Sequence, residues 1–227
     1  MSLISKLNKI KQIKEKIRSS IVDKGVAVFV SEPFSSYPQK ISAINDDHSI
    51  KDIIQGTVTE KTIPIGVNRI RDYCFEYRQN LTSIIIPDGV TTIGAYAFYR
   101  CSQLQSVNIP NTVQKISREA FYYCSKLENI ELPEGLTIID VGLLSYTKIK
   151  NFVMPSTIQT INGTAFYYCS ELEVLDMTLL NAVPTLSRTD TFTGTPSSCV
   201  FKVKSSLLES FKTAENWSYY ADRFVGV

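Results

Sequence analysis

Residues 93–110 read IGAYAFYRCSQLQSVNIP, and the same order of residue types recurs along most of the chain. This unit has an isoleucine, an Ala-Phe pair, a cysteine, a leucine and an alternating apolar run that ends in Ile-Pro. The unit ends follow one another at steps of 23, 23, 23, 22 and 23 residues, at Pro64, Pro87, Pro110, Pro133, Pro155 and Thr178. Such a period predicts a solenoid, because a unit this short buries its apolar side only by stacking on its neighbours.

The other units keep the pattern with local changes. The third and fifth contain Phe121 with Cys124 and Phe166 with Cys169 at the same places, whereas the fourth has Leu143-Leu144 in place of Ala-Phe and is one residue short. The apolar alternation before each proline predicts a short strand. We expect Leu81, Ile84 and Ile86 to point inward in the first unit, with Ile85 an apolar exception on the outer face.

The Ala-Phe-x-x-Cys part of the unit predicts one helical or 3₁₀ turn, because its phenylalanine and cysteine are three residues apart and would share one face. The predicted fold class is therefore an α/β solenoid of leucine-rich repeats, 22–23 residues each, built from short parallel strands and helical or 3₁₀ turns. The recurring cysteines fit interior packing positions better than a disulfide framework.

The repeated unit resembles the BspA-like leucine-rich repeats of bacteria, phages and some protists, over roughly residues 60–227. This resemblance implies a non-catalytic protein that presents a binding surface. It extends to the C-terminus, where Asn216-Trp217-Ser218-Tyr219-Tyr220 is similar to the family's terminal unit, although Lys204 stands where a proline is common in the family.

The C-terminal residues predict a strand-helix cap. Val200–Val203 alternates as a last strand, Ser205 is a candidate N-cap, and a short helix would carry Leu207, Leu208 and Phe211. Trp217 and Tyr220 would close the open end of the core. A ligand-stacking role for Trp217, the single tryptophan, is the alternative to a packing role.

The N-terminal segment differs in kind. Its apolar side chains recur at steps of three and four residues, which predicts an amphipathic helix of about five turns that ends near Gly25. This apolar stripe consists of Leu3, Leu7, Ile10, Ile13, Ile17 and Ile21. Residues 1–24 carry seven basic and two acidic side chains, which is typical of the solvated face of such a helix; a nucleic-acid contact is the alternative.

The first 45 residues also resemble N-terminal segments of phage and prophage structural proteins. In those proteins a segment of this kind precedes a variable module, which implies that the stripe anchors the chain to other virion proteins or forms a homo-oligomer such as a trimer. Packing of the helix on its own chain stays open. The expected domains are an attachment segment (1–45), a linker and N-terminal cap (46–64), the repeats (65–198) and a C-terminal cap (199–227).

The sequence contains no pattern typical of an enzyme. Phosphate-binding, nucleophile-elbow and Cys-x-x-Cys motifs are absent, and the single histidine, His48, lies in a polar stretch with Asp46 and Asp47 that reads as a solvated loop rather than a cation site. We expect no catalytic residue, cofactor or metal. No apolar run is long enough to span a membrane, and no Sec-type signal is expected.

Two repeated surfaces are candidates for binding a protein or a cell-surface glycan. The first is a tyrosine-rich ridge after each phenylalanine, formed by Tyr77, Tyr99, Tyr122, Tyr123, Tyr146, Tyr167 and Tyr168. The second is the outer face of the strands, with Ser106, Asn108, Asn129, Glu131, Asn151 and Asp176. Tyrosine is common in interfaces, but rings at fixed repeat positions also pack on one another, and small polar side chains also keep a surface solvated.

Three functional hypotheses follow. The sequence favours a phage or prophage virion component, such as a tail or head fibre or a decoration protein, assembled in the host cytoplasm. The first alternative is a bacterial cell-surface or secreted adhesin, and the second is a cytoplasmic protein-binding scaffold. All three share a leucine-rich-repeat surface that binds rather than catalyses.

Overall fold

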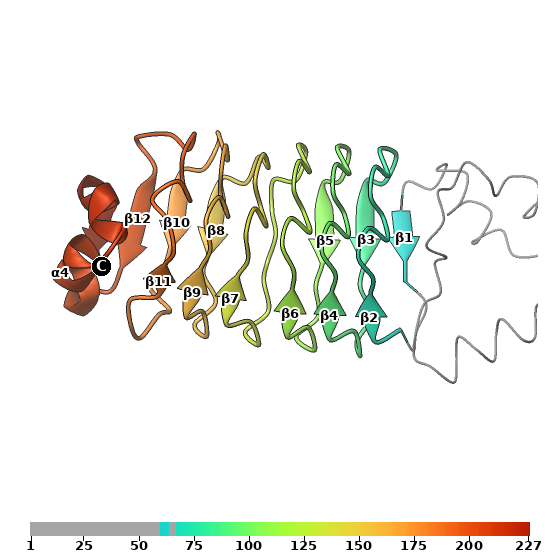
Figure 1. The fold of residues 1–227 in the computed structure, drawn as a ribbon, viewed down its shortest axis with the longest axis horizontal. Helices are drawn as coiled ribbons and strands as arrows, with labels where there is room; N and C mark the ends of the chain where they lie inside the picture. Colours follow the sequence, from blue (N-terminus) through green and yellow to red (C-terminus); the bar gives the residue numbers. More distant parts are fainter. Residues whose placement is uncertain (1–59, 64–66) are drawn as a thin grey trace, which may run out of the picture.

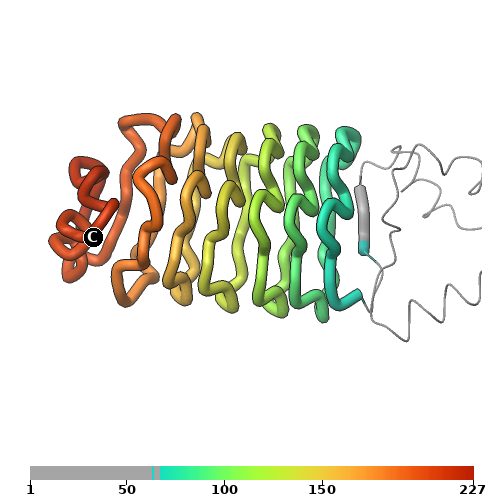
Figure 2. The backbone as a smooth tube through the Cα atoms, viewed as in Figure 1, coloured from blue at the N-terminus to red at the C-terminus, as the bar shows by residue number. Residues whose placement is uncertain are grey.

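The computed structural model describes residues 60–63 and 67–227, and in them the chain winds into coils stacked along one axis (Figures 1 and 2). We number the coils 1 to 6 by the core residue at their turn, which is Phe75, Phe98, Phe121, Leu144, Phe166 and Phe192. The predicted N-terminal helix with its stripe from Leu3 to Ile21, the 1–45 segment, most of the 46–64 linker and His48 lie outside the described residues.

One parallel ladder contains the strands that the alternation predicts. They pair in the orders β1-β3-β5 and β8-β10-β12-β13. Their bounds are β1 Glu60–Thr62, β3 Ser83–Ile85, β5 Ser106–Asn108, β8 Asn151–Val153, β10 Val174–Asp176, β12 Val200–Val203 and β13 Phe224–Gly226. The inward positions are as expected, because Leu81, Ile84 and Ile86 are buried while Ile85 is 54% exposed.

A second ladder runs through the isoleucine that opens each unit. Its two-residue strands pair in parallel in the orders β2-β4-β6 and β7-β9-β11. They are β2 Arg69–Ile70, β4 Thr92–Ile93, β6 Lys115–Ile116, β7 Ile138–Ile139, β9 Thr160–Ile161 and β11 Thr185–Leu186. The second residue of each strand is buried. The sequence analysis missed this ladder, since two residues are too few to show an alternation.

The Ala-Phe-x-x-Cys segments are consecutive β-turns, so the predicted helical or 3₁₀ turn is wrong. In coil 2 the N–H groups of Tyr99 and Cys101 donate to carbonyls three residues earlier, but Tyr96 and Arg100 have φ of 57° and 56°. Arg100 is the third residue of the turn from Phe98 to Cys101, and a left-handed residue there is typical of a type II turn. A left-handed residue at either position is incompatible with a right-handed helix.

These turns link neighbouring coils. The N–H groups of Phe98 and Arg100 point away from their own turn and donate to the carbonyls of Ala120 and Tyr122 in coil 3, at 2.8 Å each. A helical turn would keep these N–H groups within the segment. The alternation of local and inter-coil bonds therefore forms a third ladder, which explains why the turns replace a helix.

Both strand ladders are interrupted between coils 3 and 4. Among the described residues no strand is assigned at 129–131, and β6 pairs with β4 but not with β7. The turn ladder continues across this point, where Phe121 and Tyr123 donate to the carbonyls of Leu143 and Ser145. The interruption coincides with the unit that is one residue short, so the turns hold the stack together there.

The core consists of columns of equivalent side chains. Phe75, Phe98 and Phe121 stack with ring centroids 5.1 and 5.2 Å apart and planes within 1°. The cysteines behave as the sequence analysis expected: all five are free, and Cys101, Cys124, Cys169 and Cys199 are buried. Burial raises the pKa of the Cys169 thiol to about 12.

The C-terminal end of the core is covered by a compact unit of short helices. After β12 the chain forms η2 (Ser205–Leu207), α4 (Leu208–Thr213), η3 (Trp217–Arg223) and then β13. Trp217 is fully buried, and its indole N–H donates to the carbonyl of Pro184 at 2.7 Å. The tryptophan thus packs in the cap. Ser205 does not act as an N-cap, because its hydroxyl donates to the carbonyl of Val227 instead.

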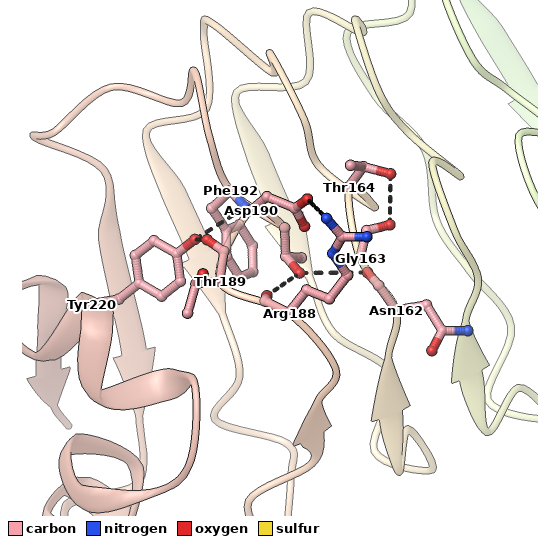
Figure 3. Close-up of polar contacts among 9 residues, drawn as sticks. Asn162, Gly163, Thr164, Arg188, Thr189, Asp190, Phe192 and Tyr220 are labelled. Carbon is pink, nitrogen blue, oxygen red and sulfur yellow. Dashed lines mark hydrogen bonds and ion pairs between the residues drawn. The ribbon is translucent and has the colours of Figure 1, made fainter.

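A second contact joins this unit to coil 6 (Figure 3). The Tyr220 hydroxyl donates to the carbonyl of Thr189 and accepts from the N–H of Phe192 at 3.3 Å. Nearby, Arg188 and Asp190 form an ion pair at 2.7 Å. The cap is therefore attached to the last coil by both aromatic packing and hydrogen bonds.

Candidate interaction surface

The predicted tyrosines lie on the turn ladder, in two columns. The first column lies one residue after the core phenylalanine and consists of Tyr99, Tyr122 and Tyr167. The second column lies two residues after the core phenylalanine, or after Leu144 in coil 4, and consists of Tyr77, Tyr123, Tyr146 and Tyr168. Two further tyrosines, Tyr73 and Tyr96, stand two residues before the phenylalanine. The sequence analysis missed this pair, although its equal position in coils 1 and 2 was a signal. We call these nine residues the tyrosine ridge.

The rings of the tyrosine ridge form one connected series of contacts. Tyr73 stacks on Tyr96 with centroids 4.9 Å apart, and Tyr99 stacks on Tyr122 at 5.1 Å. The remaining rings are joined by edge, tilted and stacked pairs at 4.6–6.4 Å, and these pairs are Tyr77–Tyr99, Tyr96–Tyr99, Tyr122–Tyr123, Tyr122–Tyr146, Tyr123–Tyr146, Tyr146–Tyr167, Tyr146–Tyr168 and Tyr167–Tyr168. Part of each ring therefore packs on a neighbouring ring.

The same rings remain open to solvent on their outer side. Tyr73, Tyr77, Tyr123 and Tyr168 are 41–53% exposed, and the other five tyrosines of the ridge are half-buried. A series of exposed aromatic rings is uncommon on a surface that only faces water, because each exposed ring leaves apolar area unburied. The ridge thus combines internal packing with a wide aromatic surface.

The backbone of the ridge is strained at most of its tyrosines. Tyr73, Tyr77, Tyr96, Tyr123, Tyr146 and Tyr168 have φ between 54° and 61°. A residue with a side chain in this region is disfavoured by about 1 kcal/mol or more. Glycine avoids this strain and stands at the equivalent places as Gly142 in coil 4 and Gly194 in coil 6. Folding alone does not call for tyrosine at these positions.

Arg100 occupies the place in coil 2 that tyrosine holds in coils 1, 3, 4 and 5. Its guanidinium carbon lies 5.7, 5.5 and 5.3 Å from the ring centroids of Tyr77, Tyr99 and Tyr123. These are cation–π distances. The Arg100 side chain is exposed, and a hydrogen bond to Tyr99 raises its pKa. The ridge therefore holds two cations, because the guanidinium carbon of Arg118 also lies 5.4 Å from the ring centroid of Tyr96.

Three phenol groups of the ridge have a raised pKa. Burial, with Tyr146 and Tyr99 nearby, raises the pKa of Tyr122 to about 12. Burial also raises the pKa of Tyr96 and of Tyr167. Each hydroxyl can both donate and accept.

The outer face of the strands is less regular than the ridge. Ser106, Asn108, Asn129, Glu131 and Asn151 are exposed, as the alternation predicts. Asn129 and Glu131, however, lie where the strand ladder is interrupted. Asp176 is half-buried, and its Oδ1 accepts hydrogen bonds from the N–H and hydroxyl of Thr178 at 2.9 and 2.6 Å. The two predicted rows are therefore discontinuous.

The described part of the chain has neither a cluster of metal-ligating side chains nor a long apolar helix. It contains no group of three or more His, Cys, Asp or Glu side chains placed to hold a metal ion. None of its helices is long and apolar enough to cross a bilayer. In the Arg188–Asp190 pair one carboxylate oxygen, Asp190 Oδ1, is buried without a hydrogen bond, but the other oxygen already pairs with the guanidinium.

The sequence matches a family model described as the BspA type leucine rich repeat region, in six copies over residues 54–173. A leucine-rich repeat protein of T. pallidum has a similar solved structure, with 25% identity and a TM-score of 0.51 over 52% of this chain and 58% of that chain. A leucine-rich repeat protein of Eubacterium ventriosum gives 23% identity and a TM-score of 0.50 over 67% of this chain and 45% of that chain. The chain spans about half the length of these proteins. No curated protein matches the sequence.

Proposed function

The chain belongs to the BspA-type leucine-rich repeat family, and from this premise we propose that it is a non-catalytic binding protein whose tyrosine ridge contacts another protein. The observation that carries the proposal is the series of exposed, strained tyrosines along coils 1 to 5, with Arg100 among them. Tyrosine and arginine are the residue types, with tryptophan, that dominate the energetic centres of protein interfaces. Lysine does not occur in the ridge.

The ridge suits a protein better than a glycan. Sugars bind aromatic rings by stacking on a free face, but the rings of Tyr73 and Tyr96, and of Tyr99 and Tyr122, lie nearly parallel, so each covers one face of the other. The exposed parts of the ridge rings and their hydroxyl groups are left for a partner. A protein surface with backbone and side-chain acceptors can use both, and rigid tyrosines lose little conformational entropy on binding.

The strand face is the second candidate surface and has less support. Its exposed side chains are small and polar, and the interruption at coils 3 and 4 breaks their rows. We therefore use Asn108, in the centre of β5, as a comparison position in the experiment below.

We propose that the protein acts at a bacterial cell surface or in the secreted fraction, which agrees with the bacterial source of the two similar repeat proteins reported above. The virion component that the sequence analysis favoured rests on residues 1–45, which lie outside the described residues, and the comparisons give it no support. A cytoplasmic scaffold would use the same ridge. Comparison of the oligomeric state of the full chain with that of residues 46–227 tests the anchoring role proposed for the N-terminal stripe.

Site-specific photo-cross-linking tests the proposed surface. A benzophenone amino acid replaces Tyr123 in one variant and Asn108 in a matched variant, each expressed in the protein's own organism and irradiated. We expect a discrete cross-linked protein from position 123 that disappears when Tyr77 and Tyr168 are also replaced by asparagine. Equal cross-linking from position 108, or persistence of the product in the asparagine variant, would contradict the ridge as the contact surface.

A further inference from the structure

We infer that Arg100 is the point at which the tyrosine ridge binds a carboxylate of an acidic polypeptide segment. This inference rests on the proposed function and adds to it the chemistry of the partner and the residue that recognises it. It starts from one irregularity of the repeat: a single cation interrupts a column that is otherwise tyrosine in coils 1 to 5.

The first argument is that Arg100 has no acidic neighbour to neutralise it. Among residues 60–63 and 67–227, no carboxylate lies within the ion-pair distance of 4.0 Å of its guanidinium, and the rings around it belong to tyrosines. The positive charge of Arg100 is therefore available to a partner.

The second argument is that the rings hold the guanidinium in place. Tyr77, Tyr99 and Tyr123 surround it at 5.3–5.7 Å. One hydrogen bond of the guanidinium is used by Tyr99, and a guanidinium has five N–H donors, so others are left for a ligand. A planar fork of N–H donors matches the two oxygens of a carboxylate. Because three rings restrict the side chain beforehand, binding orders it further at a small entropic cost.

The surrounding groups favour a polypeptide carboxylate. The neighbouring side chains are phenols, which contact backbone amides and apolar side chains with their edges and hydroxyls. The rings of Tyr99 and Tyr122 stack on each other, so one face of each is not available to a sugar ring. An aspartate or glutamate in an extended or loop segment would place its carboxylate on Arg100 and its backbone along the adjacent tyrosines.

The repeat itself supplies a matched variant. Arg100→Tyr introduces the residue that the column has in coils 1, 3, 4 and 5, so it keeps the column aromatic while it removes the guanidinium and its charge. Lys115→Gln, in β6, removes one exposed positive charge from another part of the surface. Both are compared with the full wild-type chain for binding to poly-L-glutamate, with polygalacturonate as a glycan that also carries carboxylates.

We expect the wild-type chain to bind poly-L-glutamate and Arg100→Tyr to weaken this binding by about tenfold or more, the change expected for loss of one charge-assisted contact. Lys115→Gln should change it less than about twofold, as an exposed charge contributes little. A wild-type chain that does not bind poly-L-glutamate, equal losses in the two variants, or a preference for polygalacturonate would each overturn the inference.

The same variants separate this inference from the proposed function. If Arg100→Tyr keeps the cross-linked product from position 123 while poly-L-glutamate binding is unaffected, the ridge still binds a protein but not through this carboxylate contact, and only the present inference fails. If the product does not depend on the tyrosines, the proposed function fails as well. Thermal unfolding of Arg100→Tyr confirms that the variant is folded.

Discussion

The thiol of Cys124 donates a hydrogen bond to the carbonyl of Phe98 in the preceding coil, over a sulfur–oxygen distance of 3.2 Å. The Phe98 carbonyl also accepts the N–H of Cys101, so one oxygen serves a turn within its coil and a side chain from the next. Cys101 and Cys169 make the same kind of contact to Phe75 and Leu144. The cysteine column therefore joins neighbouring coils from inside the core.

This burial predicts an order of thiol reactivity. Burial raises the pKa of Cys124 well above its ordinary value and that of Cys169 to about 12, so the reactive thiolate is scarce at both positions. Cys74 is only partly buried. In the native protein at mildly alkaline pH we expect iodoacetamide to modify Cys74 first, and Cys124 and Cys169 only after denaturation, as measured by peptide mass spectrometry. Native labelling of Cys124 at the rate of Cys74 would contradict the packing described here.

The phenylalanine column predicts a graded response to substitution. Phe98 stacks between Phe75 and Phe121, and we expect Phe98→Ala to lower the free energy of unfolding by about 3–5 kcal/mol through lost apolar contacts and a cavity. Phe98→Leu should be milder, about 1–2 kcal/mol, since coil 4 already accommodates Leu144 at this place. Denaturant unfolding of the two variants measures the difference, and equal losses would show that ring stacking matters more than volume.

Much of this architecture is readable from the sequence. Residue type at fixed spacing predicts the period, the buried cysteines and the inward positions Leu81, Ile84 and Ile86. It does so because stacked units bury the same positions against their neighbours. The two-residue ladder through Ile93 does not follow, since its hydrogen bonds run to other coils and leave no local pattern. The helical interpretation of Ala-Phe-x-x-Cys failed for a related reason: a spacing of three fits both a helical turn and a pair of β-turns.

The candidate surface was predictable only in part. The column after each phenylalanine is visible as repeated tyrosines, but the part played by Tyr73 and Tyr96 depends on ring contacts with Tyr99 that join the columns. The position of Arg100 among three rings is likewise a property of adjacent coils. Left-handed φ at tyrosine positions has no signal in residue type, because sequence preferences would assign such positions to glycine or asparagine.

The tyrosine ridge predicts an alkaline loss of stability. The pKa of Tyr122 rises from 10.0 to about 12 in the folded chain, so the folded state holds its proton more tightly than the unfolded state does. The resulting stability is fully present below pH 10 and is lost as the pH rises toward about 12. Denaturant midpoints measured across this range should fall more steeply for the wild type than for Tyr122→Phe, which has no phenol at this position to titrate. Parallel profiles would contradict the shift at Tyr122.

Backbone strain predicts that an exposed ridge tyrosine contributes little to stability. Tyr123 has φ of 58° and is 41% exposed. Asparagine tolerates this backbone region, so Tyr123→Asn relieves about 1 kcal/mol of strain while losing ring contacts of similar size. We expect a net change in the free energy of unfolding within about 1 kcal/mol, together with loss of partner binding. A large destabilisation with unchanged binding would instead assign Tyr123 to packing.

Trp217 predicts where unfolding begins and how to observe it. As the single tryptophan of the chain, it reports by fluorescence on the C-terminal cap alone. Its ring is fully buried against Phe192, Phe211 and Phe224, and its N–H is bonded to the Pro184 carbonyl. We expect blue-shifted emission in the native state and a red shift on denaturation that precedes the loss of far-ultraviolet circular dichroism, because an end unit contacts only one neighbouring coil.

The hydrogen bond between the cap and coil 6 predicts how a substitution changes these two transitions. The Tyr220 hydroxyl donates a hydrogen bond to the carbonyl of Thr189, and Tyr220→Phe removes this bond. The fluorescence transition should therefore move to a lower denaturant concentration, while the circular dichroism transition changes less. Coincident transitions in both proteins would mean that the cap and the coils unfold as one cooperative unit.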